Sequence, residues 1–249
     1  MKSRCASTII HEVLQDNHKF AGLFIVRPDV MAVRSSDPLT AATTSILLPE
    51  LRCHGFRRKT NRVMARTQDD ILQFLDLQMS AYGGKDFCVN YASISIFCPR
   101  DYFVLQPGSR LKWDNGAEAW LSAKAHDDAD ASMAKVANMV QSQALPFFES
   151  TKSVNGLLEC LKRESWGSRH HLYLEMAFCE GRRGRFGEAE SHALRAIELY
   201  HEDGRDWCAE YIALCQRLIA GIERNKLTEM FQQWIDHSVR KLGLSKIRE

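Results

Sequence analysis

Two histidines and a glutamate in the second half of the chain have a spacing that could hold a metal ion. His170 and His171 precede Glu175, and on a helix His171 and Glu175 would lie one turn apart on the same face. The order is not that of the His-Glu-x-x-His zinc motif, and no third ligand is evident. The alternative is a surface contact between a histidine and a carboxylate, so we expect no metal site from this pair.

A run of acidic residues at 126–130 gathers three carboxylates, Asp127, Asp128 and Asp130, in an expected loop. Oxygen ligands of this kind suit calcium or magnesium, but the spacing of an EF-hand loop is absent. One alternative is a solvated loop whose charges stabilise the N-terminus of the next helix. Another is an acidic surface that contacts a basic partner, which makes these three residues candidates for partner binding.

Basic residues are dense between positions 52 and 66, where Phe56 lies among them. The cluster consists of Arg52, Arg57, Arg58, Lys59, Arg62 and Arg66. It could contact phosphate or an acidic protein surface. The alternative is a polar turn and an edge strand whose charges discourage strand-to-strand aggregation. We take Arg57, Arg58 and Lys59 as the basic candidates for partner binding.

The chain contains no motif of nucleophilic or nucleotide chemistry that we recognise. There is no G-x-S-x-G, no phosphate-binding G-x-x-x-x-G-K and no dinucleotide-binding G-x-G-x-x-G. No cysteine has neighbours that mark its thiol as activated. We therefore predict a non-catalytic protein with no catalytic residue, no metal and no cofactor.

The composition is that of a globular protein. Of 249 residues, 45% are hydrophobic and 26% are charged, and the formal net charge is +2. A dedicated nucleic-acid binder usually has a larger basic excess. Eight cysteines without a C-x-x-C pair predict reduced, mostly buried thiols in a cytoplasmic protein. The apolar run at 20–26 is too short to cross a bilayer, so we expect neither a secretory signal nor a membrane anchor.

The elements that position these residues change in type along the chain. Helical periodicity from 39 to 53 stops at Gly55, and Pro49 should kink or divide that helix. Alternating apolar residues then predict antiparallel strands, and helical periodicity returns after residue 130, with Asp130 or Ser132 as the N-cap. The expected strands are 62–66, 71–79 and 87–98, with turns at 81–84 and 115–116. The expected helices are 132–148, 154–164 and 170–242, the last interrupted near 184 and at 201–204.

This order of elements predicts an α+β fold in three segments. Residues 1–36 are an N-terminal extension, and residues 37–130 are an α+β domain in which a helix precedes an antiparallel β-meander. Residues 131–249 are a C-terminal α-helical subdomain.

Two segments, GFRRKTNRVMAR at 55–66 and LQFLDLQMSAYGGKDFCVNYA at 72–92, resemble the domain of unknown function 4304 family of bacterial proteins. That family has a helix ending in Gly-Phe and basic residues, then a strand with a glutamine and a strand with Phe-x-hydrophobic-Asn. The matching positions are Gly55, Phe56, Arg57, Arg58, Lys59, Asn61, Arg66, Gln78, Phe87 and Asn90. Tyr91-Ala92 replaces the usual Leu-Gly. The resemblance implies no reaction, but proteins of this sort are often accessory or toxin-immunity proteins.

A second resemblance, at 184–189 and 196–199, is to the second half of a tetratricopeptide repeat. Gly184, Ala189 and Ala196 would let two helices approach closely, and Phe186 would fill the wedge between them. One copy without a neighbour at the expected period predicts a helical hairpin packed on the mixed domain, and not a solenoid.

These observations make an immunity-type function the first hypothesis. The expected protein is bacterial, cytoplasmic and non-catalytic, and it binds and neutralises a toxin encoded by a neighbouring gene. Neither nucleic acid nor a membrane is its expected partner. The alternative is a nucleic-acid-binding accessory protein that uses the basic turn at 52–66, and a third hypothesis is an enzyme of unfamiliar type.

Overall fold

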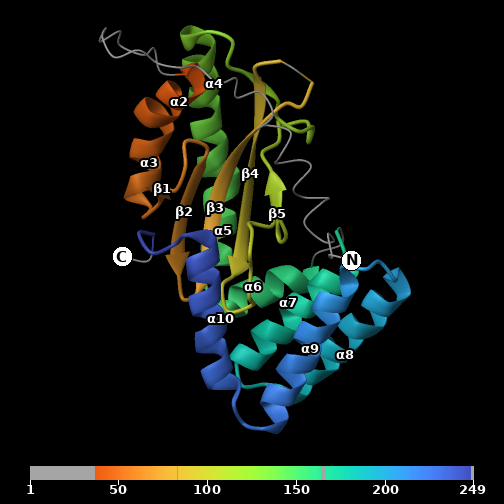
Figure 1. Ribbon diagram of the computed structural model, residues 1–249. Coiled ribbons are helices and arrows are strands. Elements are labelled where there is room, and N and C mark those ends of the chain that lie inside the picture. Colours follow the sequence, from red (N-terminus) through yellow and green to blue (C-terminus); the bar gives the residue numbers. More distant parts are fainter. Residues whose placement is uncertain (1–36, 83, 164–166, 248–249) are drawn as a thin grey trace, which may run out of the picture.

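The structure is a computed structural model, and it describes residues 37–82, 84–163 and 167–247. The expected N-terminal extension at 1–36 lies outside the described residues. In Figure 1 the upper part of the molecule contains helices beside an antiparallel sheet, and the lower part is helical and meets the lower end of that sheet. The predicted α+β class is confirmed.

The described part of the chain forms one sheet of six strands, antiparallel throughout. The strands are β1 (Arg57–Arg58), β2 (Val63–Gln68), β3 (Ile71–Met79), β4 (Asp86–Ser95), β5 (Gly108–Arg110) and β6 (Leu121–Ser122). β1 to β5 are neighbours in chain order, and β6 also pairs with β4. In the central pair, Asp76 lies opposite Asn90 and Leu75 opposite Tyr91. Because side chains alternate along a strand, these two residue pairs lie on opposite faces of the sheet.

Two interrupted helices cover one face of the sheet. The first consists of α2 (Pro38–Ala42), η1 (Thr43–Leu47) and α3 (Leu48–Cys53), and the second of α4 (His126–Met139), η2 (Val140–Ala144) and α5 (Leu145–Ser150). Each contains a π-helical segment immediately before a Leu-Pro pair, at Pro49 and at Pro146. Proline lacks an N–H and its ring clashes with the carbonyl four residues earlier, which a wider preceding turn relieves. The division expected at Pro49 is therefore a local widening of a continuous helix.

The first hydrophobic core lies between that face of the sheet and these helices. It contains Leu75 and Val89 of the sheet and Val136 of α4, all fully buried. Phe148 of α5 packs against Phe56, with ring centroids 5.1 Å apart. Because this face is used in packing, residues that alternate with the core positions point to the opposite face.

Five further helices form the C-terminal part. They are α6 (Val154–Arg163), α7 (Arg169–Arg182), α8 (Phe186–Asp203), α9 (Cys208–Glu223) and α10 (Leu227–Leu242). α8 packs against both α7 and α9. A second core joins Phe178 and Trp234 of these helices to Leu72 and Ile94 at the lower end of the sheet. No described helix is long and apolar enough to cross a membrane.

A buried ion pair connects the sheet to the C-terminal helices. Arg100, in the loop after β4, lies against Glu175 of α7, and Ser95 Oγ donates to Glu175 Oε2 at 2.8 Å. The Nε of Arg100 donates to the Ser95 carbonyl at 3.1 Å, and its backbone N–H donates to Ser238 Oγ of α10 at 3.1 Å. One arginine therefore contacts β4, α7 and α10.

The observed elements confirm the central strands. They correct the start of the helix predicted from residue 132 and the continuous helix predicted from 204 to 242, which breaks between α9 and α10. β3 has the predicted bounds, and the turn at Asn115-Gly116 is closed by a bridge between Lys112 and Glu118. The helix expected from residue 132 begins at His126, and its N-cap residue is Ala125. The acidic run is therefore helical and not a loop, because three carboxylates near a helix N-terminus complement its partial positive charge.

The two hydrophobic cores place the division between the two parts of the chain after α5, later than predicted. The boundary predicted between residues 130 and 131 falls inside α4, and α4 to α5 belong to the first core. In the predicted hairpin of α7 and α8, Gly184 adopts a positive φ of 76° in the turn. Phe186 does not fill the wedge between the helices, because 43% of its surface is exposed. The tetratricopeptide resemblance itself remains a prediction.

Candidate functional site

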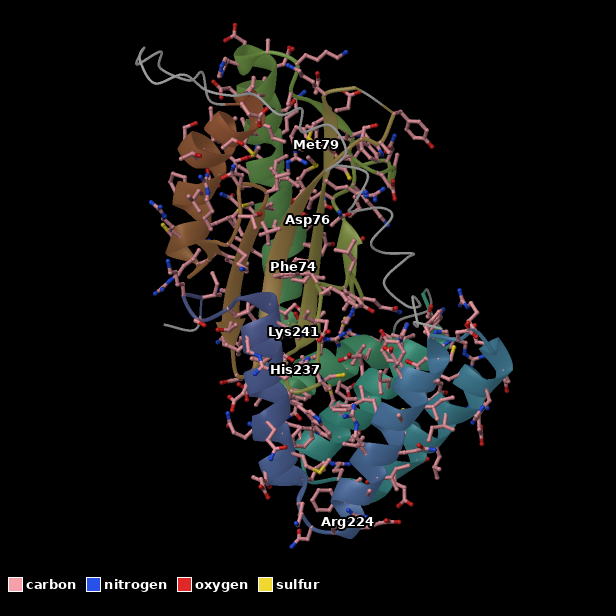
Figure 2. The ribbon with its side chains drawn as sticks, viewed as in Figure 1. Phe74, Asp76, Met79, Arg224, His237 and Lys241 are labelled. Carbon is pink, nitrogen blue, oxygen red and sulfur yellow. The ribbon has the colours of Figure 1, made fainter. Side chains whose placement is uncertain are left out.

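The upper half of the sheet carries a polar group of side chains on the face opposite α4. The residues, which we call the polar sheet patch, are Asp76, Gln78, Asn90, Arg110, Glu118 and Trp120. In the described structure, apolar packing on this face begins one residue pair lower, at Phe74 and Ala92. Figure 2 shows Phe74, Asp76 and Met79 in this order along β3, leading away from His237 and Lys241 of α10. The patch therefore lies on the part of β3 that is farther from α10.

Strand register brings the members of the patch together. Asn90 lies opposite both Asp76 on β3 and Arg110 on β5. The chain then reverses at Gly116, and the bridge between Lys112 and Glu118 returns Glu118 and Trp120 to the side of Arg110. Antiparallel pairing of this kind places side chains from three separate segments within contact distance.

Arg110 is the centre of the patch. Its Nε donates to Asn90 Oδ1 at 3.1 Å, its Nη2 donates to Gln78 Oε1 at 3.3 Å, and its Nη1 forms an ion pair with Glu118. The guanidinium carbon also lies 5.3 Å from the centroid of the Trp120 ring, which is cation–π geometry. These contacts hold a long, flexible side chain in one orientation before any partner arrives.

Asn90 and Asp76 form the buried side of the patch. Asn90 is 3% exposed, and its Nδ2 donates to Gln78 Oε1 at 3.0 Å and to Asp76 Oδ2 at 3.4 Å. Burial raises the pKa of the Asp76 carboxyl above its ordinary value, although the Asn90 hydrogen bond and the charge of Arg62 act in the opposite direction. Burial likewise raises the pKa of the neighbouring Cys88 thiol to about 11. Cys88 is therefore a protonated thiol at neutral pH and a poor nucleophile.

The solvent side of the patch is aromatic and acidic. Trp120 is 41% exposed, whereas Arg110 and Glu118 have side chains that are 23% and 51% exposed. Tyr82, in the turn between β3 and β4, is 98% exposed. Tryptophan and arginine are among the residue types that most often contribute large binding energies in protein interfaces. The arrangement suits recognition of a surface.

The basic candidates are used largely within the molecule. Arg57 Nη1 donates to the Lys246 carbonyl at 2.9 Å, and Arg58 Nη2 donates to Thr44 Oγ1 at 2.5 Å. Arg66 donates to Gln73 and lies 4.8 Å from the Phe56 ring centroid. The structure thus divides this cluster among the C-terminal segment, η1 and the buried side of the sheet. Lys59 lies near Gly243, at the end of α10.

The acidic candidates Asp127, Asp128 and Asp130 lie on the first turns of α4 and are exposed. They belong neither to the polar sheet patch nor to the basic cluster. At the N-terminus of α4 their negative charges interact favourably with the helix dipole. Their role in partner binding stays a prediction.

The histidine and glutamate on α7 have separate inward partners. Glu175 contacts Arg100, while His171 Nδ1 lies 2.7 Å from the hydroxyl of Tyr200. Burial lowers the pKa of His171 to about 3, so this imidazole is neutral at physiological pH. Among the described residues, no group of three or more His, Cys, Asp or Glu side chains is placed to hold a metal ion.

Comparison with known families finds one match, to the part of the chain that contains the patch. Residues 47–150 match the sequence profile of the family described as Domain of unknown function (DUF4304). This segment of the chain is similar to the DUF4304 family. The match extends from the end of η1 to the end of α5 and includes the whole described sheet, so α6 to α10 lie outside the matched segment. No curated protein and no solved structure matches this chain.

Two residues of the patch were already visible in the sequence. Gln78 and Asn90 were among the positions that resemble the family, and both lie in the polar sheet patch, within the matched segment. Sequence reasoning missed Asp76, Arg110 and Trp120. The available signal was strand alternation, because Asp76 and Gln78 are successive polar residues on one face of β3, whereas the other face has a single polar residue, Gln73.

Proposed function

We propose that this protein binds another protein through the polar sheet patch, and that it acts as an immunity-type protein that neutralises a toxin encoded by a neighbouring gene. One observation supports binding at this position above all. Arg110 is held between the Trp120 ring and the oxygen atoms of Gln78, Asn90 and Glu118 on a partly exposed sheet face. A tryptophan and an arginine ordered in advance lose little conformational entropy when a partner docks.

The toxin-neutralising role and a cytoplasmic location are part of the same proposal. The cytoplasmic location is supported by cysteines that are mostly buried in the described residues. The toxin-neutralising role rests on what the sequence resemblance implies, because the matched family is itself described as one of unknown function. A stoichiometric inhibitor requires a rigid binding surface and no reactive group. The patch, with a protonated thiol at Cys88 and internally paired charges, meets that requirement.

Coexpression with the product of the adjacent gene tests the proposal. We expect the two proteins to co-purify as a stable complex and the neighbouring product alone to arrest growth in the absence of this chain. Trp120→Ala should weaken the complex by about 30-fold or more, the loss expected for a central interface residue. Circular dichroism should show an unchanged fold, because Trp120 is 41% exposed.

Trp113→Ala is the matched control. Trp113 lies in the same connection between β5 and β6 and is 36% exposed, but alternation about the Lys112–Glu118 bridge directs it to the face opposite Trp120. It should change affinity by less than about threefold. Equal losses in the two variants would remove the patch from the proposal, and absence of both binding and protection would remove the immunity function.

A further inference from the structure

The outer surface of α8 has a pattern that core packing does not explain. Phe186, Glu190, Leu194, Glu198 and Glu202 recur at intervals of four and are all exposed; we call them the α8 ridge. Phe186 is 43% exposed and Leu194 48% exposed. Residues four apart form one continuous row on a helix, about 24 Å long over this span.

The opposite side of α8 packs against the neighbouring helices. Ala189, Ala193 and Ala196 are fully buried where α8 packs against its neighbours. A helix whose packing stripe consists of small residues does not need large apolar side chains on its solvent side. In Figure 1, α8 and α9 lie on the side of the helical part that faces away from the sheet.

The charge of α8 itself is negative. Between Phe186 and Asp203 there are five carboxylates and one arginine, although the whole chain has a formal net charge of +2. Arg185, immediately before the helix, lies 3.7 Å from Glu188. On the ridge, Arg195 pairs with Glu198 at 2.6 Å and approaches Glu202 at 3.9 Å. In the part of the chain that the structure describes, Glu190 between the two apolar residues has no ion-pair partner. Such a surface repels phosphate groups and attracts cationic side chains.

We propose that the α8 ridge is a docking site for a basic amphipathic helix of a partner protein. The i, i+4 spacing of Phe186 and Leu194 through Glu190 matches the ridges with which two helices interdigitate. Apolar side chains of the incoming helix contact Phe186 and Leu194, and its lysines or arginines pair with Glu190 and Glu202. This site is separate from the polar sheet patch and does not depend on the identity of the partner proposed there.

Fluorescence anisotropy with a designed probe tests this inference on the full-length chain. The probe is a labelled amphipathic peptide of about 18 residues, five helical turns, with leucines on one face and lysines on the other. A peptide with glutamate in place of lysine is its counterpart. We expect the lysine peptide to bind at least about tenfold more tightly than the glutamate peptide, and its affinity to fall by about tenfold or more between about 50 and about 300 mM salt.

Variants separate the ridge from general charge attraction. Leu194→Ala and Glu190→Lys should each weaken the lysine peptide by about fivefold or more. Glu229→Lys on α10 makes the same charge change at another exposed glutamate and should have little effect. Equal binding of the two peptides, salt-independent binding, or equal effects of Glu190→Lys and Glu229→Lys would overturn the inference. Concentration-dependent dimerisation of the protein alone that Leu194→Ala abolishes would also overturn it, because the ridge would then bind a second copy.

Discussion

Removal of the Glu175 carboxylate should be among the most destabilising single changes in this protein. The side chains of Glu175 and Arg100 are only 7% and 11% exposed, and the same carboxylate accepts a hydrogen bond from Ser95. Glu175→Ala leaves the Arg100 guanidinium buried without its counter-charge. Breaking a buried pair on one side typically costs about 3–5 kcal/mol. The free energy of unfolding should fall by that amount.

Urea unfolding measured by far-UV circular dichroism provides the assay. A dependence of about 3 kcal/mol per M converts the expected loss into a midpoint shift of about 1 M or more. Glu198→Ala is the matched control, because Glu198 pairs with Arg195 at the surface and is 61% exposed. That change should cost less than about 1 kcal/mol.

A double variant distinguishes the lost ion pair from lost volume. Arg100→Met combined with Glu175→Leu removes both charges while filling similar space, and it should recover most of the stability, because replacing a complete buried pair by apolar residues is often neutral. Two results would refute the reasoning. One is a Glu175→Ala midpoint equal to that of Glu198→Ala, and the other is a double variant no more stable than Glu175→Ala.

Two further predictions concern buried polar groups. Burial lowers the pKa of His171 to about 3 in the folded protein, whereas in the unfolded chain this imidazole has a pKa of about 6.5. The free energy of unfolding should therefore fall as the pH decreases from about 6 toward 3, by up to about 1.4 kcal/mol per pH unit. His171→Phe should flatten this part of the curve in urea titrations at each pH; an unchanged slope would contradict the assignment. Gln73 Nε2 donates to the Phe148 carbonyl at 2.6 Å and its Oε1 accepts from Arg66 at 2.7 Å, so Gln73→Leu should cost about 1–3 kcal/mol for each buried group left unpaired. Gln78→Leu, at a partly exposed position of the same strand, should cost clearly less by thermal unfolding, and equal losses would show that burial is not the cause.

Local sequence patterns were sufficient to predict most helices and strands, because the formation of these elements depends on short stretches of sequence. Alternation between Ile71 and Met79 predicted β3 with the observed bounds, and Asn115-Gly116 predicted the turn. The start of α4 was missed because no usual N-cap residue precedes it; Ala125 occupies that position, and Asp127 and Asp128 stabilise the first turn by charge. The break between α9 and α10 also escaped prediction, since Asn225 adopts a positive φ of 53° without a glycine or proline to indicate it.

The candidate site was predictable only in fragments. The positions of Gln78 and Asn90 were evident from the resemblance, yet neither indicates which residues lie nearby. Arg110 was not singled out at all, and it contacts Asn90, which is 20 positions away in the chain. The basic cluster could serve phosphate, an acidic protein surface or a polar turn, and the sequence did not indicate that Arg57 donates to the Lys246 carbonyl, at a separation of 189 residues. A charged side chain that pairs within its own molecule has the same sequence signature as one that remains available.

The sequence carried a resemblance to the DUF4304 family, and residues 47–150 match that family. By itself it also determined the class of the fold, the central strands and most helices. Those properties follow from side-chain periodicity and turn chemistry within about ten residues. Tertiary structure alone decided which distant residues meet, namely Arg110 with Trp120 and Glu175 with Arg100. It also decided which side of α8 stays exposed. Register and packing set these contacts, and both depend on residues far apart in the chain, so no local pattern encodes them.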